Sequence, residues 1–201
     1  MDEFNIVLAG VGGQGIILAA QVLGTAAVND GFNVRVSEIH GMAQRGGAVV
    51  SDVRIGENVL APTVLDGNAD VLLGFEPIET LRNLKFASGK TIVIMNAERI
   101  MPTELTAKRA KYPSLEETIQ KINAFTKNVI VIEASKLAKE AGNILTQNVV
   151  LLGALAAVGK IPIKTETLID ALRELIPPKQ LEVNIKAFKI GYEKAEKLIK
   201  S

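Results

Sequence analysis

The chain has 201 residues, 48% of them hydrophobic and 22% charged, which is enough to form one globular domain with a substantial core. Lysine and arginine number 23 against 22 acidic residues, and the resulting charge of +1 provides no overall field for nucleic acid or an anionic membrane. With no cysteine and a single histidine, the chain has no thiolate for an iron–sulfur cluster or a nucleophile, and we expect no metal site. Because the acidic start leads into a strand pattern rather than a signal sequence, we expect a cytoplasmic protein.

A glycine-rich turn near the start of the chain follows an apolar run and precedes an apolar segment. The run covers residues 4–9, the turn is Gly10-Val11-Gly12-Gly13-Gln14-Gly15, and the segment extends from Ile16 to about Asn29. This order predicts a strand, a loop and a helix. The turn also satisfies the G-x-G-x-x-G fingerprint of dinucleotide-binding proteins.

A glycine loop at the start of a helix can bind an anion, because its backbone N–H groups are unpaired and the positive end of the helix dipole lies there. Gly10, Gly12, Gly13, Gln14 and Gly15 are therefore the predicted binding residues. Close packing around a tight turn also requires glycine and is the alternative interpretation of Gly10, Gly12 and Gly15. The Gln14 amide favours a functional role, since it can donate to a ligand or hold a neighbouring loop.

The rest of the chain alternates strand and helix patterns before it becomes helical. This alternation predicts one α/β domain over residues 1–201: a three-layer sandwich with a mostly parallel sheet, a Rossmann-like first unit and a helical C-terminal part. The apolar run at 149–158 is shorter than the roughly 20 residues that cross a bilayer and is expected to form a buried helix. Further strands are expected at 33–38, 48–55, 69–75, 91–96 and 128–133, a proline-led helix at 76–81, a capped helix after Tyr112, and C-terminal helices at 135–140, 147–158, 165–175 (with Thr165 as N-cap) and 181–200.

A second glycine cluster extends from His40 to Gly47. Glu38, just before it, lies about 20 residues beyond the first turn, where a dinucleotide-binding chain places the acid that binds the ribose. Within the cluster, Arg45 can bind a carboxylate or phosphate in bidentate fashion, Gln44 can donate and accept, and His40 titrates near neutrality. A structural histidine and an internal or interfacial salt bridge are the alternatives for His40 and Arg45. No serine or aspartate completes a recognisable nucleophilic arrangement with His40.

The two loops together resemble the gamma-type domain of the 2-oxoacid:ferredoxin oxidoreductase family. The form His40-Gly41-Met42-Ala43-Gln44-Arg45-Gly46-Gly47 is similar to the branch of that family that acts on indolepyruvate. Three further segments fit the family in the same order along the chain: residues 69–77 with their Glu-Pro turn, residues 148–155 with an Asn and a Leu-Gly pair, and the Asn184, Ala187, Phe188 and Gly191 pattern.

The resemblance implies a subunit of a larger enzyme that oxidatively decarboxylates aryl pyruvates with coenzyme A, yields aryl-acetyl-CoA and passes electrons to ferredoxin. It implies that thiamine diphosphate and [4Fe-4S] clusters reside in a partner alpha subunit. On this basis His40, Gln44 and Arg45 are the predicted catalytic residues, and the isolated chain is a possible homodimer. Two alternatives stay open: a stand-alone NAD-dependent oxidoreductase with Glu38 on the ribose, and a non-catalytic interaction subunit.

Overall fold

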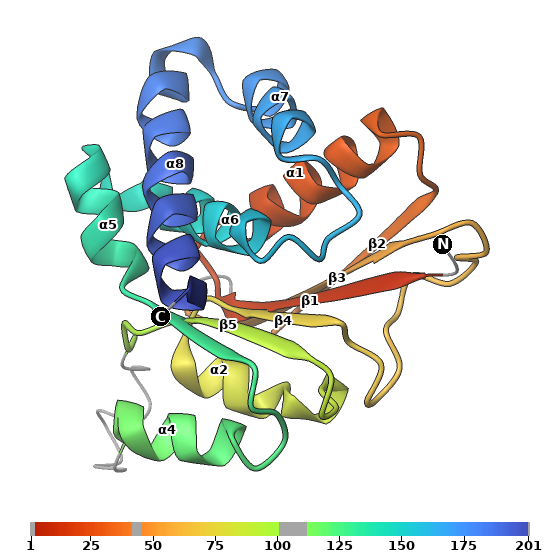
Figure 1. The fold of residues 1–201 in the computed structure, drawn as a ribbon, viewed down its shortest axis with the longest axis vertical. Coiled ribbons are helices and arrows are strands. Elements are labelled where there is room, and N and C mark those ends of the chain that lie inside the picture. The colour runs from red at the N-terminus through yellow and green to blue at the C-terminus, as the bar shows by residue number, and fades with distance from the viewer. Residues whose placement is uncertain (1–2, 42–45, 101–111, 201) are drawn as a thin grey trace.

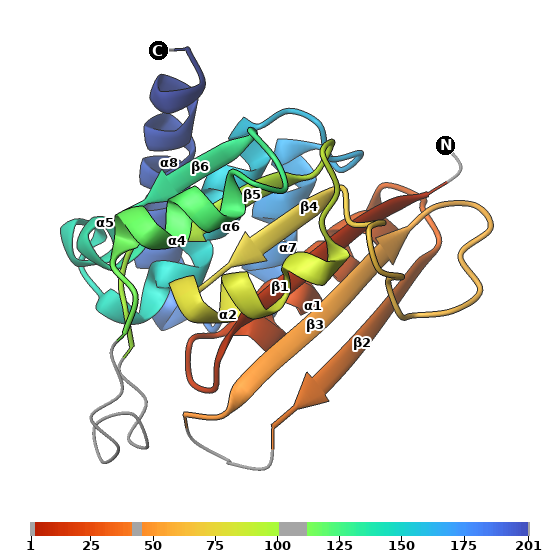
Figure 2. The ribbon, with the colours of Figure 1, turned by 90° about the horizontal axis from the view of Figure 1, so that it is seen from below.

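The chain folds around one six-stranded sheet, as described for residues 3–41, 46–100 and 112–200 of a computed structural model. The strand order is β2-β3-β1-β4-β5-β6 (Figure 2). β1, β4, β5 and β6 pair in parallel, whereas β3 pairs antiparallel with both β1 and β2. The strands are β1 (Phe4–Val11), β2 (Val34–His40), β3 (Ala48–Ile55), β4 (Val71–Gly74), β5 (Ile92–Asn96) and β6 (Val129–Ile132).

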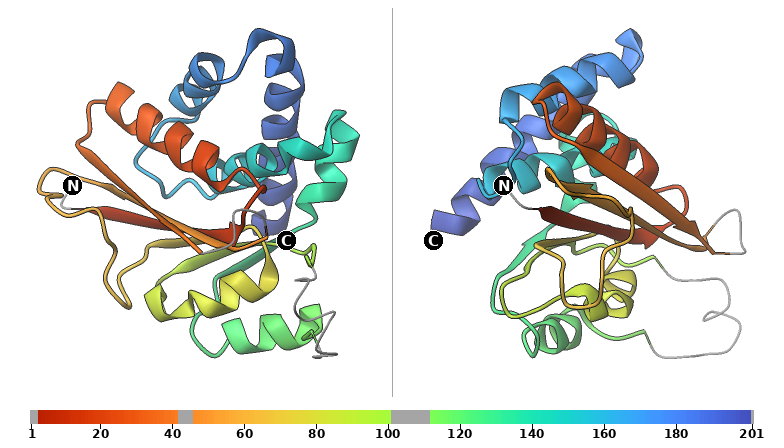
Figure 3. Two further views of the ribbon diagram at one scale, coloured as in Figure 1. Left: turned by 180° about the vertical axis from the view of Figure 1, so that it is seen from behind. Right: turned by 90° about the vertical axis from the view of Figure 1, so that its right-hand side faces the viewer.

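Helices cover both faces of this sheet, which gives three layers (Figures 1 and 3). One face carries α1 (Ile16–Asn29), α5 (Ala134–Ala141), α6 (Gln147–Ala157), α7 (Thr165–Leu175) and α8 (Pro178–Lys200), with the short turn η2 (Ile144–Thr146) before α6. The other face carries α2 (Pro77–Arg82), η1 (Leu84–Phe86) and α4 (Leu115–Ile122). The predicted three-layer α/β fold with a mostly parallel sheet and a helical C-terminal part is confirmed.

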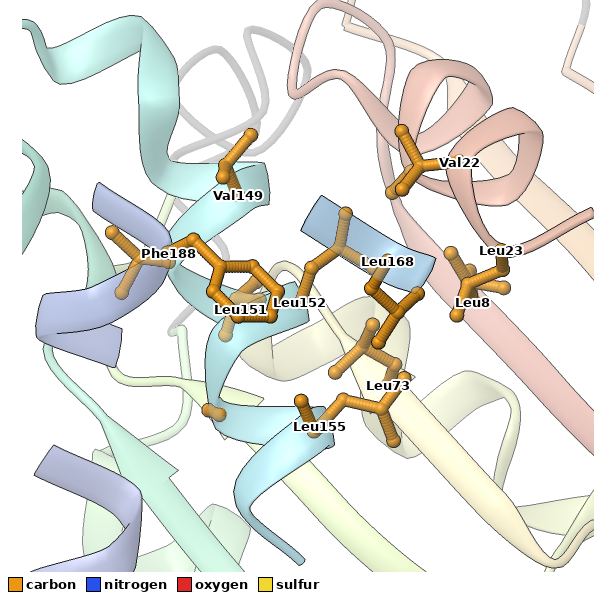
Figure 4. Close-up of a cluster of buried hydrophobic side chains, with 14 of the residues drawn as sticks. Leu8, Val22, Leu23, Leu73, Val149, Leu151, Leu152, Leu155, Leu168 and Phe188 are labelled. Atoms are coloured by element: carbon orange, nitrogen blue, oxygen red, sulfur yellow. The ribbon is translucent and has the colours of Figure 1, made fainter. Parts of the chain in front are cut away.

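The two-residue period of β1 assigns its side chains to two separate cores. Ile6 and Leu8 belong to the cluster under α1, α6, α7 and α8, whereas Val7 and Ala9 belong to the cluster on the other face. Central strands covered on both faces are mostly apolar, and β4 is apolar throughout while β1 is apolar except for Asn5. Figure 4 shows the larger cluster, in which Leu8 and Leu73 of the sheet lie among side chains of α1, α6 and α7.

Helices α6 and α8 are in closer contact than side chains would permit. A Cβ atom added to Gly153 of α6 would lie 2.0 Å from the carbonyl oxygen of Phe188 in α8. A Cβ added to Gly191 of α8 would lie 2.0 Å from the carbonyl oxygen of Val150 in α6. Glycine is therefore required at both positions, because backbone lies against backbone.

The helix starts show where local sequence determines structure and where it does not. Ser114 and Glu117 form a capping box at α4, which confirms the predicted capped start. Thr165 as the N-cap of α7 was wrong: Lys164 occupies that position without a side-chain cap, and Thr165 is the first helical residue. The reason is tertiary, because Asp30 at the end of α1 accepts hydrogen bonds from the Lys164 N–H at 2.7 Å and the Thr167 hydroxyl at 2.8 Å.

Within the described residues, none of the helices combines the length and the apolar composition that crossing a membrane requires.

Candidate functional site

The predicted glycine loop connects the end of β1 to the start of α1 at the carboxyl edge of the parallel strands. Gly13 and Gly15 have φ angles of +99° and +76°, a region that glycine enters without steric cost. The Gly12 N–H donates to the Gly47 carbonyl at 2.9 Å. The two glycine clusters therefore meet in the structure, since Gly47 ends the second cluster just before β3.

Gln14 lies beneath the loop rather than on its surface. It is 4% exposed, its Oε1 accepts from the Val11 N–H at 2.7 Å, and its Nε2 donates to the Phe75 carbonyl at 2.8 Å. The Phe75 carbonyl also accepts from Asn96 Nδ2 at 3.3 Å. Gln14 thus fixes the shape of its own loop and attaches it to the chain just beyond β4.

The glycines of the loop divide into two kinds according to what surrounds them. A Cβ at Gly10 would lie 2.6 Å from both Gln14 Oε1 and Phe75 Cβ, and one at Gly15 would lie 2.5 Å from Asn148 Nδ2. At Gly13, by contrast, no atom lies within 4 Å of the added Cβ. Close packing therefore explains why residue 10 is glycine and is one reason why residue 15 is glycine. At Gly13 no neighbouring atom would exclude a side chain.

A pocket of about 570 Å³ opens at this loop and the first turn of α1. The N–H groups of Gly13, Gly15, Ile16 and Ile17 donate to no acceptor among the described residues. Helix α1 has no side-chain cap and no acidic residue in its first turn. The start of α1 is therefore electropositive, and these N–H groups can donate hydrogen bonds to a bound anion. The pocket is lined by Val11, Gly12, Gly13, Gly15, Ile16, Ile17, His40, Gly41 and Val49.

His40 brings the second cluster to the rim of this pocket. It is the last residue of β2, and in the sheet it lies opposite Val49, which in turn lies opposite Gly10. Its Nε2 is 3.4 Å from Glu38 Oε2, and its side chain is half exposed. The structure thus brings His40 together with Gly12 and Gly13. The predicted residues Gln44 and Arg45 lie outside the described residues.

The position of Glu38 differs from that of a ribose-binding acid. In a dinucleotide-binding unit the second strand lies directly beside the first. Here β3 lies between β1 and β2, so Glu38 is on an edge strand two positions from the glycine loop, and its carboxylate faces His40. The first unit shares the strand, loop and helix of a Rossmann unit but not this neighbouring strand.

Two buried amides beside the loop, Asn148 and Asn96, were not among the predicted site residues. Asn148, in the first turn of α6, donates from Nδ2 to the Gly15 carbonyl at 3.2 Å. Asn96, at the end of β5, donates from Nδ2 to the Phe75 carbonyl. Its Oδ1 accepts a hydrogen bond from the Ala134 N–H at 3.0 Å. The sequence signal for such a contact is an asparagine directly before the apolar run of α6.

Glu76 caps the neighbouring helix α2 and is almost completely buried. Its carboxylate accepts from the Glu79 N–H at 3.0 Å, from the Ile100 N–H at 3.3 Å and from the Tyr112 hydroxyl. Burial raises the pKa of Glu76, and these backbone donors only partly oppose that effect. Burial likewise raises the pKa of Glu79, against the charge of Arg82. The Glu79 carboxyl pairs with Arg82 of the same helix, whereas the Glu76 carboxyl also bonds to Ile100 and Tyr112 outside α2.

Known proteins share this fold and sequence over almost the whole chain. The family model described as pyruvate ferredoxin/flavodoxin oxidoreductase matches residues 5–194. Indolepyruvate oxidoreductase subunit IorB of Pyrococcus horikoshii is 45% identical over 201 residues, 99% of either chain. The gamma subunit of a keto/oxoacid ferredoxin oxidoreductase from Geobacter sulfurreducens has a TM-score of 0.68 at 26% identity and covers 96% of this chain and 98% of that one.

A third protein shows the fold within a longer chain. The 2-oxoglutarate:ferredoxin oxidoreductase from Magnetococcus marinus, solved with 2-oxoglutarate, coenzyme A and succinyl-CoA bound, has a TM-score of 0.76 at 23% identity. The match covers all of this chain and 32% of that one.

The chain belongs to the pyruvate ferredoxin/flavodoxin oxidoreductase family, a family of oxidoreductase enzymes. Within it, the resemblance to the subunit of the indolepyruvate branch is confirmed by the full-length similarity to subunit IorB.

Proposed function

We propose that this chain is the beta subunit of an indolepyruvate-type ferredoxin oxidoreductase, a cytoplasmic complex that converts aryl pyruvates and coenzyme A to aryl-acetyl-CoA. The similarity to an indolepyruvate oxidoreductase subunit over 99% of the chain supports the branch. The chain has no cysteine for cluster ligands, which supports placing the [4Fe-4S] clusters, with thiamine diphosphate, in a partner alpha subunit that passes electrons to ferredoxin.

The observation that carries a role for the site is the set of free N–H groups at the start of α1. Gly12, Gly13 and Gly15 line the pocket beside them, so this face would receive an anionic part of coenzyme A or of a partner loop. Gly10 and Gln14 would support that cradle from below. His40 at the rim would position the second loop, from which Gln44 and Arg45 would orient substrate, coenzyme A or the partner.

Coexpression with the alpha subunit tests the proposal. We expect dye reduction that depends on both indolepyruvate and coenzyme A in the complex, and little or none from the alpha subunit alone. Full activity of the alpha subunit by itself would contradict the completing role of this chain. In the active complex, Arg45→Ala should lower the rate without unfolding the chain, and an unchanged rate would remove Arg45 from the site.

The two alternative functions make different predictions for the isolated chain. A stand-alone NAD-dependent enzyme requires saturable NADH binding, which the placement of β3 between Glu38 and the glycine loop disfavours. A purely structural subunit requires association with the alpha subunit but no effect of loop substitutions on kinetics. Equilibrium titration with NADH tests the first, and sedimentation combined with loop variants tests the second.

A further inference from the structure

The N–H groups at the start of α1, which have no acceptor among the described residues, bind an anion well only if their direction is fixed. Gly15, the N-cap of α1, has a left-handed backbone and carries no side chain that could hold the turn. Its carbonyl accepts the first helical hydrogen bond, from the Ala19 N–H at 3.0 Å. The peptide plane that begins at this carbonyl carries the Ile16 N–H, so whatever fixes the Gly15 carbonyl also orients that donor.

Asn148 supplies that restraint from a distant part of the sequence. Its Nδ2 donates to the Gly15 carbonyl at 3.2 Å, and a Cβ on Gly15 would collide with the same amide. Asn148 is 2% exposed, while Val149, Val150 and Leu151 beside it in α6 are buried apolar residues. A buried amide is costly unless its hydrogen bonds are made, so its presence in this apolar helix points to the loop contact.

The element that carries Asn148 is itself held rigidly. The contacts of Gly153 and Gly191 bring the backbones of α6 and α8 together, and neither helix can shift toward the other without steric overlap. On the far side of the loop, Gln14 attaches it to the Phe75 carbonyl. The loop is therefore held between the C-terminal helices and the end of β4.

We propose that Asn148 is a positioning residue for coenzyme A: it fixes the start of α1 so that the Ile16 N–H group is preorganised for an anionic group of that ligand. This inference rests on the proposed function. Asn148 itself touches no reacting atom, so its loss should weaken coenzyme A binding while the chemical step proceeds at its normal rate.

The test compares Asn148→Leu with Asn184→Leu in the complex with the alpha subunit. Leucine has a similar size but no donor. Asn184 is also buried, lies on α8, and donates to a backbone carbonyl, that of Gln180 at 2.8 Å. We expect the KM for coenzyme A to rise about three- to tenfold in Asn148→Leu, the effect of one hydrogen bond, with kcat and the KM for indolepyruvate unchanged. Asn184→Leu should leave all three at the wild-type values.

Asn148→Asp provides a second variant in case the leucine variant does not assemble. It keeps the shape of the side chain but places a negative charge beside the start of α1, where it competes with an anionic ligand. Its KM for coenzyme A should rise at least as far. Wild-type KM values for coenzyme A in the assembled Asn148 variants would overturn the inference.

A readout without catalysis separates this inference from the proposed function. Inorganic pyrophosphate should raise the thermal midpoint of the wild-type chain and of Asn184→Leu more than that of Asn148→Leu. An inactive wild-type complex would contradict the proposed function alone. Equal stabilisation of all three chains by pyrophosphate would overturn the positioning role alone.

Discussion

Glycine serves opposite purposes at the contact between α6 and α8 and at the loop between β1 and α1. In the helix contact, Gly153 and Gly191 lie against backbone carbonyls, and an added Cβ would approach them to 2.0 Å. In the loop, Gly13 has a positive φ angle and open space where its side chain would be. The first pair allows two elements to approach, whereas Gly13 leaves room beside free N–H groups.

The loop itself contains both kinds of glycine. Gly10 is packed against Gln14, Phe75 and Ile16, whereas Gly13 borders the pocket. What a side chain would meet therefore separates structural glycines from candidate binding glycines better than the G-x-G-x-x-G spacing does. Substitutions in the two regions should accordingly affect different properties, stability in one and ligand binding in the other.

The largest loss of stability is expected for Gly153→Ala. The new methyl group would meet the Phe188 carbonyl, and backbone cannot move aside as a flexible side chain can, so we expect a loss of about 3 kcal/mol. Urea unfolding measures this loss. Gly24→Ala in α1 is the control, since its methyl group would lie 3.3 Å from the partly exposed Val36, and it should be neutral or stabilising. Equal stability of the two variants would refute the packing account.

An intermediate loss is expected for Gln14→Leu. The Val11 N–H would lose its acceptor and the Phe75 carbonyl one of its two donors, so the chain should unfold about 2 kcal/mol more easily. Hydrogen exchange should show faster opening of the loop than of α8. An unchanged free energy of unfolding would mean that these buried bonds contribute nothing to the loop.

A smaller effect is expected for the pH dependence of stability. The pKa of Glu76 is raised in the folded chain, so the unfolded chain gives up this proton first as pH rises. The contribution of Glu76 to stability should therefore be largest below the ordinary glutamate pKa and fall as pH rises through the raised value. Glu76→Gln should make this decline shallower, as measured by urea unfolding from about pH 4 to pH 8. The exposed Glu116→Gln is the control, and identical slopes for both variants would contradict the burial argument.

The sequence was informative where local patterns suffice. The strands were predicted to within two residues at either end, because apolar runs between turns define buried strands. The capping box at Ser114 follows from two residues three positions apart. The order of the strands did not follow from the chain, because the insertion of β3 between β1 and β2 depends on pairing between distant segments.

The site was only partly predictable for the same reason. The spacing located Gly12, Gly13 and His40, which line one pocket. It did not reveal that Gln14 is turned inward, nor that Asn148, 133 residues further along the chain, reaches Gly15. Contacts of this kind arise from tertiary packing, which no local pattern encodes.

The most direct test of the difference between packed and open glycines compares Gly13→Asp with Gly31→Asp. Gly31 is a matched control, since it too is exposed, has a φ angle of +86° and has no atom within 4 Å of an added Cβ. Both variants should lose similar stability, because both force a side chain into the left-handed region. The measurement is kcat/KM for coenzyme A in the complex with the alpha subunit. A marked loss in Gly13→Asp and a wild-type value in Gly31→Asp are predicted, and equal values in the two variants would contradict a ligand-binding role for the loop.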